Sequence, residues 1–365
     1  MSLPTVNWAE RLLAVRTFLS DNTQINDPEN YSKLTGTIDF LLNPALNPRT
    51  IEVIQQQNSN AGKYRSVEIR YQPHWGTEDL VTNDDSLICD KNNQRRDEIA
   101  TYDVNLFTSY KFTLEMNYLR ENNEDGVNVQ RRLDDGFRRS MRVLRENMSS
   151  QLLAQMVLNI GTNPAQNAAA GTYTTVQMLN SAGGADVVNF DFIKNDQEEN
   201  FMTGPIAIIG QGGLSNANKY FNRLATGNLN TDAGVDIREV ANQFGMLHFK
   251  DQSTTANLGD ANRVLAVYPG LTQFYGYNLY DNTEFIEVPG RTIYGTMPDP
   301  IYPINWDFKI EWDNNCSTGN GLQGAWVITV FKYFDLFTTP TAAFGGVYGD
   351  LSGFNGILGY EITSA

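Results

Sequence analysis

The sequence is short of the residues that build most catalytic and metal sites. It contains two cysteines, Cys89 and Cys316, and two histidines, His74 and His248, in 365 residues. The cysteines lie far apart and outside any CxxC or Cys/His cluster, so they form neither a disulfide framework nor a zinc-site pattern. We interpret both as reduced, buried thiols. Neither histidine belongs to a Ser/His/Asp order with an elbow motif or to HExxH, which argues against a hydrolase.

Basic side chains and long apolar runs are scarce as well. Lys plus Arg number 27 against 42 Asp plus Glu, a formal net charge of -15. Nucleic-acid binding is driven by basic side chains that release counterions. An acidic chain instead suits a wall that stands near packed nucleic acid without binding it. No apolar run reaches the roughly 18 residues of a membrane span, and the first twenty residues lack the features of a secretion signal. We therefore expect a soluble chain with no membrane partner.

The composition is that of a folded protein. Hydrophobic residues make up 41% of the chain, which is enough for a core, and 19% charged residues are too few for a disordered chain. A chain of this length holds two ordinary domains, or one body with large excursions.

The longest regular pattern runs from Val127 to Ile160. Apolar residues recur there at steps of three and four: Leu133, Phe137, Met141, Leu144, Met148, Leu152 and Met156. This spacing places them on one face of an α-helix, and Gly161 and Pro164 end it. At a rise of about 1.5 Å per residue the helix would be roughly 50 Å long, more than an ordinary globular domain requires. The pattern predicts an extended rod with one apolar face.

The opposite face of the rod is rich in arginine: Arg131, Arg132, Arg138, Arg139, Arg142 and Arg145. Asp134, Asp135 and Glu146 are spaced to form i,i+4 pairs with some of them, each pair contributing about 0.3–0.5 kcal/mol. Six arginines against three acids leave a surplus in a chain whose net charge is negative. Two interpretations are open: a solvated helix face, or contacts with acidic patches on neighbouring copies.

Segments that extend from the body are predicted before the rod. Residues 8–19 have the spacing of a short amphipathic helix, either an N-terminal arm or the first helix of the core. Residues 51–55 and 64–71 alternate around a Gly/Asn turn, which predicts a long β-hairpin with at most one buried face. Residues 101–119 also alternate and predict a strand pair or one long bent strand.

The rest of the chain mixes strands and helices, which predicts an α+β fold. Strands are expected at 205–210, 264–268, 307–312 and 325–334, and helices at 214–224 and 271–277. The last of these strands is nearly continuous in apolar residues and is expected inside a sheet. From Phe344 to Tyr360 six glycines alternate with aromatic residues, which predicts an adhesive arm or a loosely ordered end.

Two loops resemble ligand sites but lack essential residues. The segment 210–213 joins a predicted strand to a predicted helix, but the Walker lysine and the full GxGxxG spacing are missing. Residues 228–239 approach the spacing of a calcium loop, but Ala233 stands where the turn glycine is needed. We therefore expect no cofactor, no metal and no catalytic residues.

The order of these elements resembles the major capsid protein of tailed bacteriophages, which has the Hong Kong 97 phage-like fold. Residues 327–334, with Pro340 and 343–344 after them, look like the strand that returns to the peripheral domain of that family. Residues 205–210 and 264–270 resemble strands of its axial domain. The likeness covers residues 50–344 and lies in architecture rather than in a sharp motif.

The resemblance implies a division of the chain into six segments. They are an N-terminal arm (1–49), an extended β-hairpin loop (50–88), a peripheral domain with a long spine helix (89–165), an axial domain (166–324), the return strand of the peripheral domain (325–344) and a glycine-rich C-terminal tail (345–365).

The resemblance also implies a structural protein rather than an enzyme. Such a chain would self-assemble, as hexamers and pentamers, into an icosahedral shell that encloses double-stranded DNA without sequence-specific binding. It would be found in the virion capsid after assembly in the cytoplasm of the host bacterium, with portal, scaffolding or decoration proteins as further partners.

The intersubunit contacts expected under this interpretation are Arg131, Arg138, Arg142 and Arg145 of the rod, and Lys63, Arg65 and Arg70 of the hairpin. Two other interpretations stay open. One is an encapsulin-type compartment of the same fold, and the other is a carbohydrate-binding or adhesive phage protein.

Overall fold

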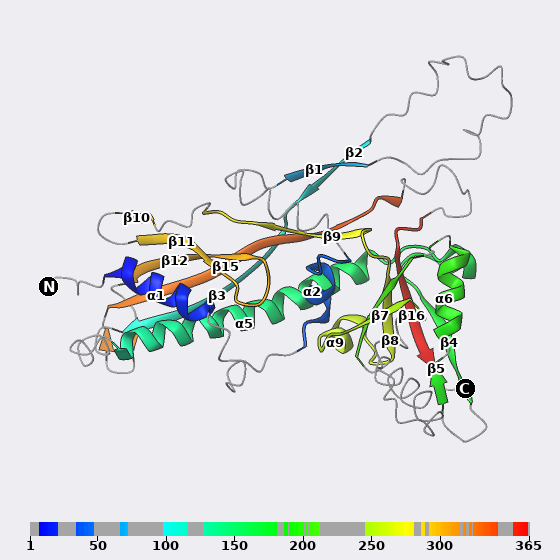
Figure 1. Ribbon diagram of the computed structural model, residues 1–365, viewed down its shortest axis with the longest axis horizontal. Helices are drawn as coiled ribbons and strands as arrows, with labels where there is room; N and C mark the ends of the chain where they lie inside the picture. The colour runs from blue at the N-terminus through cyan, green and yellow to red at the C-terminus, as the bar shows by residue number, and fades with distance from the viewer. Residues whose placement is uncertain are drawn as a thin grey trace, which may run out of the picture.

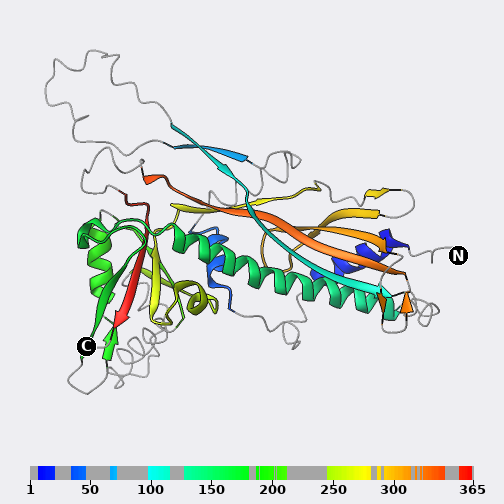
Figure 2. The same cartoon turned by 180° about the vertical axis from the view of Figure 1, so that it is seen from behind.

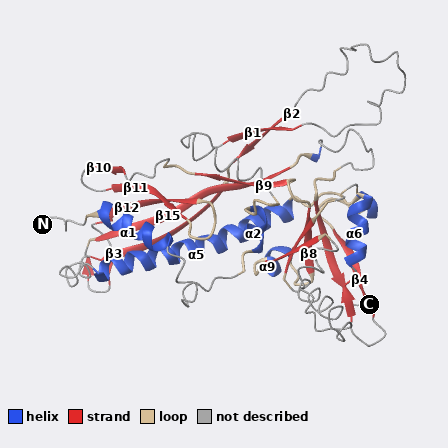
Figure 3. Cartoon of the chain, in the orientation of Figure 1, coloured by secondary structure: helices blue, strands red, loops and turns tan. Residues whose placement is uncertain are grey.

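A computed structural model of the chain describes residues 7–20, 34–46, 66–71, 98–115, 127–180, 186–188, 190–200, 202, 204–211, 245–280, 286–288, 292–313, 317–318, 321–322, 324–341 and 353–363. These residues form an elongated unit, in which a sheet lies along one long helix, and a compact unit at one end of it (Figure 1). Figure 3 shows the same division by secondary structure, with strands in both units.

The rod predicted at 127–160 is helix α5, Val127–Leu158, which has 32 residues. Its apolar face is buried as predicted, since all seven side chains of the periodic pattern are at most 1% exposed. The helix packs against strands β3, Leu106–Glu115, and β15, Ala325–Thr338. A continuous apolar stripe on one side of the helix thus meets one face of a sheet.

The sheet of the elongated unit has the strand order β10-β11-β12-β15-β3, and β9 pairs with the far part of β15. Its other strands are β9 Thr272–Tyr277, β10 Ile286–Val288, β11 Thr292–Pro298 and β12 Asn305–Asp313. All of its pairings are antiparallel. β15 is paired on both edges, with β3 on one side and β12 and then β9 on the other. The interior position predicted for this strand is therefore confirmed.

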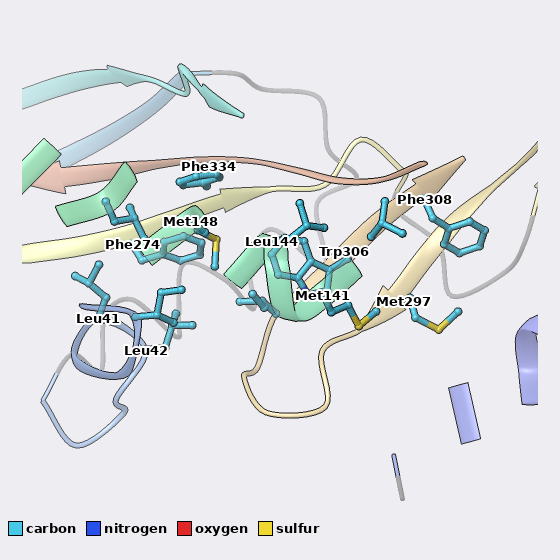
Figure 4. Close-up of a cluster of buried hydrophobic side chains, with 14 of the residues drawn as sticks. Leu41, Leu42, Met141, Leu144, Met148, Phe274, Met297, Trp306, Phe308 and Phe334 are labelled. Atoms are coloured by element: carbon cyan, nitrogen blue, oxygen red, sulfur yellow. The ribbon is translucent and has the colours of Figure 1, made fainter. Parts of the chain in front are cut away.

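Alternate residues of β15 point into the core. Ile328, Val330 and Phe334 are fully buried in the cluster that includes the apolar face of α5. Phe137 of α5 stands edge-on to Phe308 at 5.6 Å between ring centroids. Figure 4 shows how side chains from the sheet meet those of the helix. Burying a large apolar side chain contributes about 1.5–3 kcal/mol, so this interface is the main stabilising contact of the unit.

The N-terminal helix belongs to this core. Helix α1, Trp8–Ser20, buries Trp8, Leu12, Val15 and Leu19 and packs against α5. The Trp8 ring stands edge-on to Trp326 of β15 at 5.2 Å. Of the two interpretations open from the sequence, the first helix of the core is the one that the structure shows, and not a free arm. A short helix, α2, Gly36–Leu41, follows and is buried except at Asp39.

The compact unit is a mixed sheet with the order β5-β4-β16-β8-β6-β7. The bounds are β4 Tyr173–Asn180, β5 Asp186–Val188, β6 Ile206–Gly210, β7 Met246–Lys250, β8 Arg263–Val267 and β16 Ile357–Thr363. Its helices are α6 Phe190–Glu199 and α9 Thr254–Leu258, and a 3-10 turn at Pro164–Gln166 leads into it. β6 and β8 confirm the strands predicted at 205–210 and 264–268. The mixture of helices and sheets in both units confirms the α+β class.

The prediction for the C-terminal tail was wrong. Residues 357–363 form β16, which lies between β4 and β8 in the middle of the compact sheet. Ile357, Leu358, Tyr360 and Ile362 are buried there. Gly359 marks close packing rather than looseness, because a Cβ there would lie 2.8 Å from Cδ1 of Tyr173. Residues 357–363 of the tail are therefore a structural strand and not an arm.

Two further predictions are corrected by the sheets. Residues 272–277 form strand β9 and not a helix, because their aromatic side chains pair along the second half of β15. Strands β9 to β14, between residues 272 and 322, do not belong to the compact sheet. The axial segment predicted at 166–324 therefore extends past the last strand before β9 that does belong to it. The helix predicted at 214–224 lies outside the described residues.

A two-stranded ribbon projects from the sheet (Figure 2). It pairs β1, Ser66–Tyr71, with β2, Glu98–Asp103, in antiparallel register. The sequence predicted residues 51–55 as the partner of 66–71, but 51–55 lie outside the described residues. The partner in the structure is β2, which follows β1 in the sequence. The ribbon therefore crosses the boundary expected at residue 88. β2 leads after two residues into β3, and each pairs with a different strand, so one bent run describes 98–115. A small pairing of β13, Ser317–Thr318, with β14, Gly321–Leu322, completes the strands.

Removing the C-terminal strand tests its structural role. A chain that ends at residue 352 loses the strand that joins β4 to β8, so we expect it to be insoluble, or to show fast amide exchange throughout β4, β6 and β8. A chain that ends at residue 363 is the matched control and should behave as the full chain. Slow exchange in the compact sheet of the shorter chain would contradict the central position of β16.

Candidate functional site: surfaces for self-assembly

The arginines of α5 divide between the surface and the interior. Arg131 and Arg139 are exposed and form no ion pair with a described residue, whereas Arg142 is half-buried. Arg138 binds Asp135 at 3.1 Å, an i,i+3 pair, and its guanidinium lies 5.5 Å from the ring centroid of Phe18. Arg138 therefore helps to hold α1 against α5. Of the arginines predicted to contact neighbours, Arg131 keeps a side chain that is fully available to another copy.

Arg145 does not have the role predicted for it. Its side chain is buried, and Nη1 donates to both carboxylate oxygens of Asp299, at 3.0 and 3.2 Å. Asp299 also accepts from Nε1 of Trp306 at 2.8 Å and from the backbone N–H groups of Ile301 and Tyr302. The helical spacing placed Arg145 with the surface arginines, but the loop between β11 and β12 folds over this part of α5. Arg145 is thus an internal anchor of that loop.

The carboxylate of Asp251 joins the two units. One of its oxygens accepts from the backbone N–H of Thr37 at 3.1 Å, from the hydroxyl of Thr37 at 2.7 Å and from the hydroxyl of Ser149 at 2.6 Å. The other accepts from the backbone N–H of Ser253 at 2.8 Å. The donors come from α2, from α5 and from the turn that precedes α9. Because Asp251 is 1% exposed, these bonds replace its lost hydration and fix the angle between the units.

Next to this junction lies a second polar contact between distant segments. Tyr302 donates to Asp39 of α2, and its hydroxyl is 3.1 Å from that of Thr35. Burial, and then the hydrogen bond to Asp39, raise the pKa of Tyr302 beyond its usual range. The loop that carries Asp299 therefore also holds α2 in place.

An aromatic patch covers the face of the sheet that points away from α5. Phe107 of β3 is 43% exposed, and its ring lies 4.8 Å from that of Tyr333. The patch continues through Phe331 to Tyr280, at 6.1 Å, and from there to Tyr294, at 4.8 Å. Phe107 is the exposed member of the patch, the three tyrosines are half-buried, and Phe331 is buried beneath them. Exposed aromatic surface is a frequent mark of a protein interface. The sequence did not predict this patch. Both faces of β15 are apolar, so its pattern does not distinguish the face in the core from the face that points away from α5.

The base of the ribbon is fixed to the sheet. The Tyr102 hydroxyl donates to the carbonyl of Thr338 at 2.8 Å, and its ring stands edge-on to Phe337 at 4.0 Å. The backbone N–H of Asn105 donates to the carboxylate of Asp335 at 2.9 Å. Burial raises the pKa of Asp335. These contacts hold the ribbon at the end of β15, so that it leaves the sheet in a defined direction.

The basic residues predicted on the hairpin are only partly located. Lys63 and Arg65 lie outside the described residues. Arg70 is on strand β1, opposite Ile99 of β2. Of the three basic residues predicted to contact neighbours, the structure thus places one, Arg70, on the ribbon.

The described residues offer little for catalysis or metal binding. His248 lies on β7, where burial, and then the charge of Lys250, lower its pKa to about 4. His74, both cysteines and the segment 228–239 lie outside the described ranges. Within those ranges no group of acidic, histidine or cysteine side chains could hold a metal ion. None of the helices that the structure describes is both long and apolar enough to cross a membrane.

Comparisons with known proteins give similarities of structure only. No protein-family model and no curated protein matches the sequence. The chain is similar to a chain of the capsid asymmetric unit of cyanophage A-1(L), with 11% identity over 94% of this chain and 99% of that chain and a TM-score of 0.49. It is also similar to a chain of the capsid of cyanophage P-SCSP1u, with 10% identity, coverage of 83% and 84%, and a TM-score of 0.39.

A third similarity is to a chain of the procapsid of satellite phage P4, with 10% identity, coverage of 87% and 91%, and a TM-score of 0.38. These neighbours are phage capsid proteins. At such low identity the similarity concerns the fold alone, so we take the function from the surfaces of this chain.

Replacing Asp251 by Asn tests the junction. The amide keeps the shape of the side chain but removes its charge. It also has one accepting oxygen, whereas the donors around Asp251 bind two. We expect the free energy of unfolding of the unassembled chain to fall by about 2–4 kcal/mol, measured by urea denaturation. Asp103→Asn, at an exposed position, is the control and should change it by less than about 0.5 kcal/mol. Equal effects of the two variants would refute a special role for Asp251.

Arg145 and Arg139 form a matched pair on one helix. Arg145→Met leaves the buried carboxylate of Asp299 without its cation, and we expect a loss of about 3–5 kcal/mol of unfolding free energy. Arg139→Met removes an exposed charge and should leave the stability of the unassembled chain within about 0.5 kcal/mol. Both values come from the same denaturation experiment. A stable Arg145→Met variant would show that the ion pair does not anchor the loop.

Proposed function

We propose that this chain is a structural protein that self-assembles, as hexamers and pentamers, into the icosahedral shell around the double-stranded DNA genome of a tailed bacteriophage. The observation that carries the proposal is the combination of an elongated helix-and-sheet unit, a compact unit fixed at its end and a ribbon that projects from the sheet. Such a shape presents separate surfaces to several neighbours.

Each of these surfaces has a distinct chemistry. The exposed face of α5 presents Arg131 and Arg139, the open face of the sheet presents the aromatic patch, and the ribbon presents backbone edges. In a chain of net charge -15, exposed arginines have many acidic partners on other copies. Contacts between different surfaces of identical chains propagate around a ring, and rings can close into a shell.

The buried junctions support the same proposal. A shell closes only if every subunit holds nearly the same angle between its parts. The hydrogen bonds of Asp251 and the ion pair of Arg145 with Asp299 tie α2, α5, the β11–β12 loop and the compact unit into one arrangement. Modest contacts between such rigid subunits then add up to a stable assembly.

The acidic composition fits the proposed contents. Packed DNA next to a strongly basic wall would adhere to it, whereas an acidic wall repels phosphate and leaves the genome free to enter and leave. The protein would accordingly be found in the virion capsid, assembled in the cytoplasm of the host. Portal, scaffolding and decoration proteins are its proposed additional partners.

Electron microscopy of the purified recombinant full-length chain tests the proposal. We expect closed shells, tubes, or hexameric and pentameric rings. The nucleic-acid content of shells produced in infected cells then separates a genome container from an enzyme-loaded compartment of the encapsulin type. A chain that stays monomeric at high concentration and binds a glycan would contradict the proposal and favour the adhesive alternative.

The double variant Arg131→Gln/Arg139→Gln tests the basic face of α5. We expect the protein concentration needed for assembly to rise at least about tenfold, equivalent to about 1.4 kcal/mol per subunit, with the unfolding free energy unchanged. Lys194→Gln, which removes a charge from the compact unit, is the control. Assembly can be followed by light scattering, and unaltered assembly of the double variant would exclude this face from the contacts.

A further inference from the structure

A lysine lies in the interior of the elongated sheet. Lys332 is in the middle of β15 and is 3% exposed. Its Nζ donates to the carbonyl of Asn305 at 2.9 Å and contacts the side-chain oxygen of Asn278. Both acceptors are neutral amide oxygens, and lysine is rarely buried without an ion pair. Neither the core nor the proposed assembly surfaces account for this amine.

A buried carboxylate lies next to the contact. Asp307 of β12 is 0% exposed and pairs in register with Phe331, the residue before Lys332. It accepts from the backbone N–H of Leu279, the residue after Asn278, at 2.6 Å. The amine of Lys332 contacts the amide of Asn278. The carboxylate of Asp307 binds the residue after Asn278 and acts through its charge on the amine.

The surroundings favour the neutral amine. Burial lowers the pKa of Lys332 to about 8, although the charge of Asp307 acts in the opposite direction. At pH 7 about one amine in ten is then unprotonated, far more than in an exposed lysine. A neutral, desolvated lysine amine is a nucleophile.

The backbone is shaped to bring the amine to this place. A Cβ on Gly276 would lie 2.9 Å from Cε of Lys332 and 3.0 Å from Cε1 of Phe274. The absence of a side chain at 276 therefore leaves room for the stem of Lys332 against β9. The amine is held against the amide group of Asn278 in a place that excludes water, and such positioning can replace a large part of a reaction barrier.

We propose that Lys332 and Asn278 become joined by an isopeptide bond within the chain, with Asp307 carrying the proton. Asp307 first takes a proton from Nζ of Lys332. The neutral amine then attacks Cγ of Asn278, which gives a tetrahedral oxyanion. A proton passes from the attacking nitrogen to Nδ2, the bond from Cγ to Nδ2 breaks, and ammonia leaves as the oxyanion reforms the carbonyl. Asp307 then gives its proton to the departing ammonia and is restored as a carboxylate. One amide is consumed and one is formed, so no oxidant or other reactant is needed.

The bond would join the segment after β9 to the central strand of the sheet. It lies within one subunit, so it is independent of the proposed assembly and of its partners. The link would hold the end of β9 to β15 after local opening of the sheet. The subunit would thus form this internal crosslink by itself, without another enzyme.

The mass of the intact, denatured full-length chain tests the proposal. We expect a mass about 17 Da below that of the sequence, the loss of one ammonia. Tryptic digestion should give one branched product that contains Asn278 and Lys332, with no cleavage after Lys332. Fragmentation of this product identifies the linked residues directly and does not depend on any variant.

Three variants separate this bond from other losses of ammonia. Lys332→Met and Asn278→Ala should have the masses of their sequences, and Lys309→Met, on the neighbouring strand, should keep the deficit. A succinimide at Asn278 would lose the same mass but would persist in Lys332→Met. Asp307→Asn should slow formation at least about tenfold. A full sequence mass of the unaltered chain after prolonged incubation at pH 9, in shells and in free subunits, would overturn the proposal, as would a deficit that survives Lys332→Met.

Discussion

The burial of one face of α5 against β3 and β15 is the contact on which the rest of the fold depends. Its seven periodic side chains are almost completely buried, and at about 1.5–3 kcal/mol each their combined contribution is as large as the net stability of a typical domain, about 5–15 kcal/mol. α1 docks on the same helix, and α2 and the β11–β12 loop are tied to it through Ser149 and Arg145. The helix therefore positions both the open sheet face and the compact unit.

The polar groups that this fold buries lie where segments distant in sequence meet. Arg145 reaches Asp299, Asp251 reaches Thr37 and Ser149, and Lys332 reaches Asn278. Each would cost free energy if left alone, so each contributes only when its partners are in their final places. An apolar core tolerates small shifts, whereas these contacts accept one geometry. They give the subunit the fixed shape that a closed assembly of identical copies requires.

The sequence predicted correctly those elements whose burial follows from their own pattern of apolar residues. The spacing in α5 and the apolar runs of β6, β8 and β15 gave the right structure, because periodicity and burial coincide there. The errors came from partners far away in the chain. β16 was missed because its glycines suggested looseness, and only the proximity of Tyr173 shows why a side chain is excluded at Gly359. Arg145 was placed on the surface because helical spacing does not reveal the loop that covers it.

Amide hydrogen exchange in the free subunit and in the assembled shell tests the central claim most directly. If α5 organises the single copy, its amides between 133 and 156 exchange slowly in both states. Strand β3, the edge strand that carries Phe107, then gains further protection on assembly. If α5 exchanges in the free subunit as quickly as an isolated helix would, the apolar interface forms only within the shell, and this account of the fold is wrong.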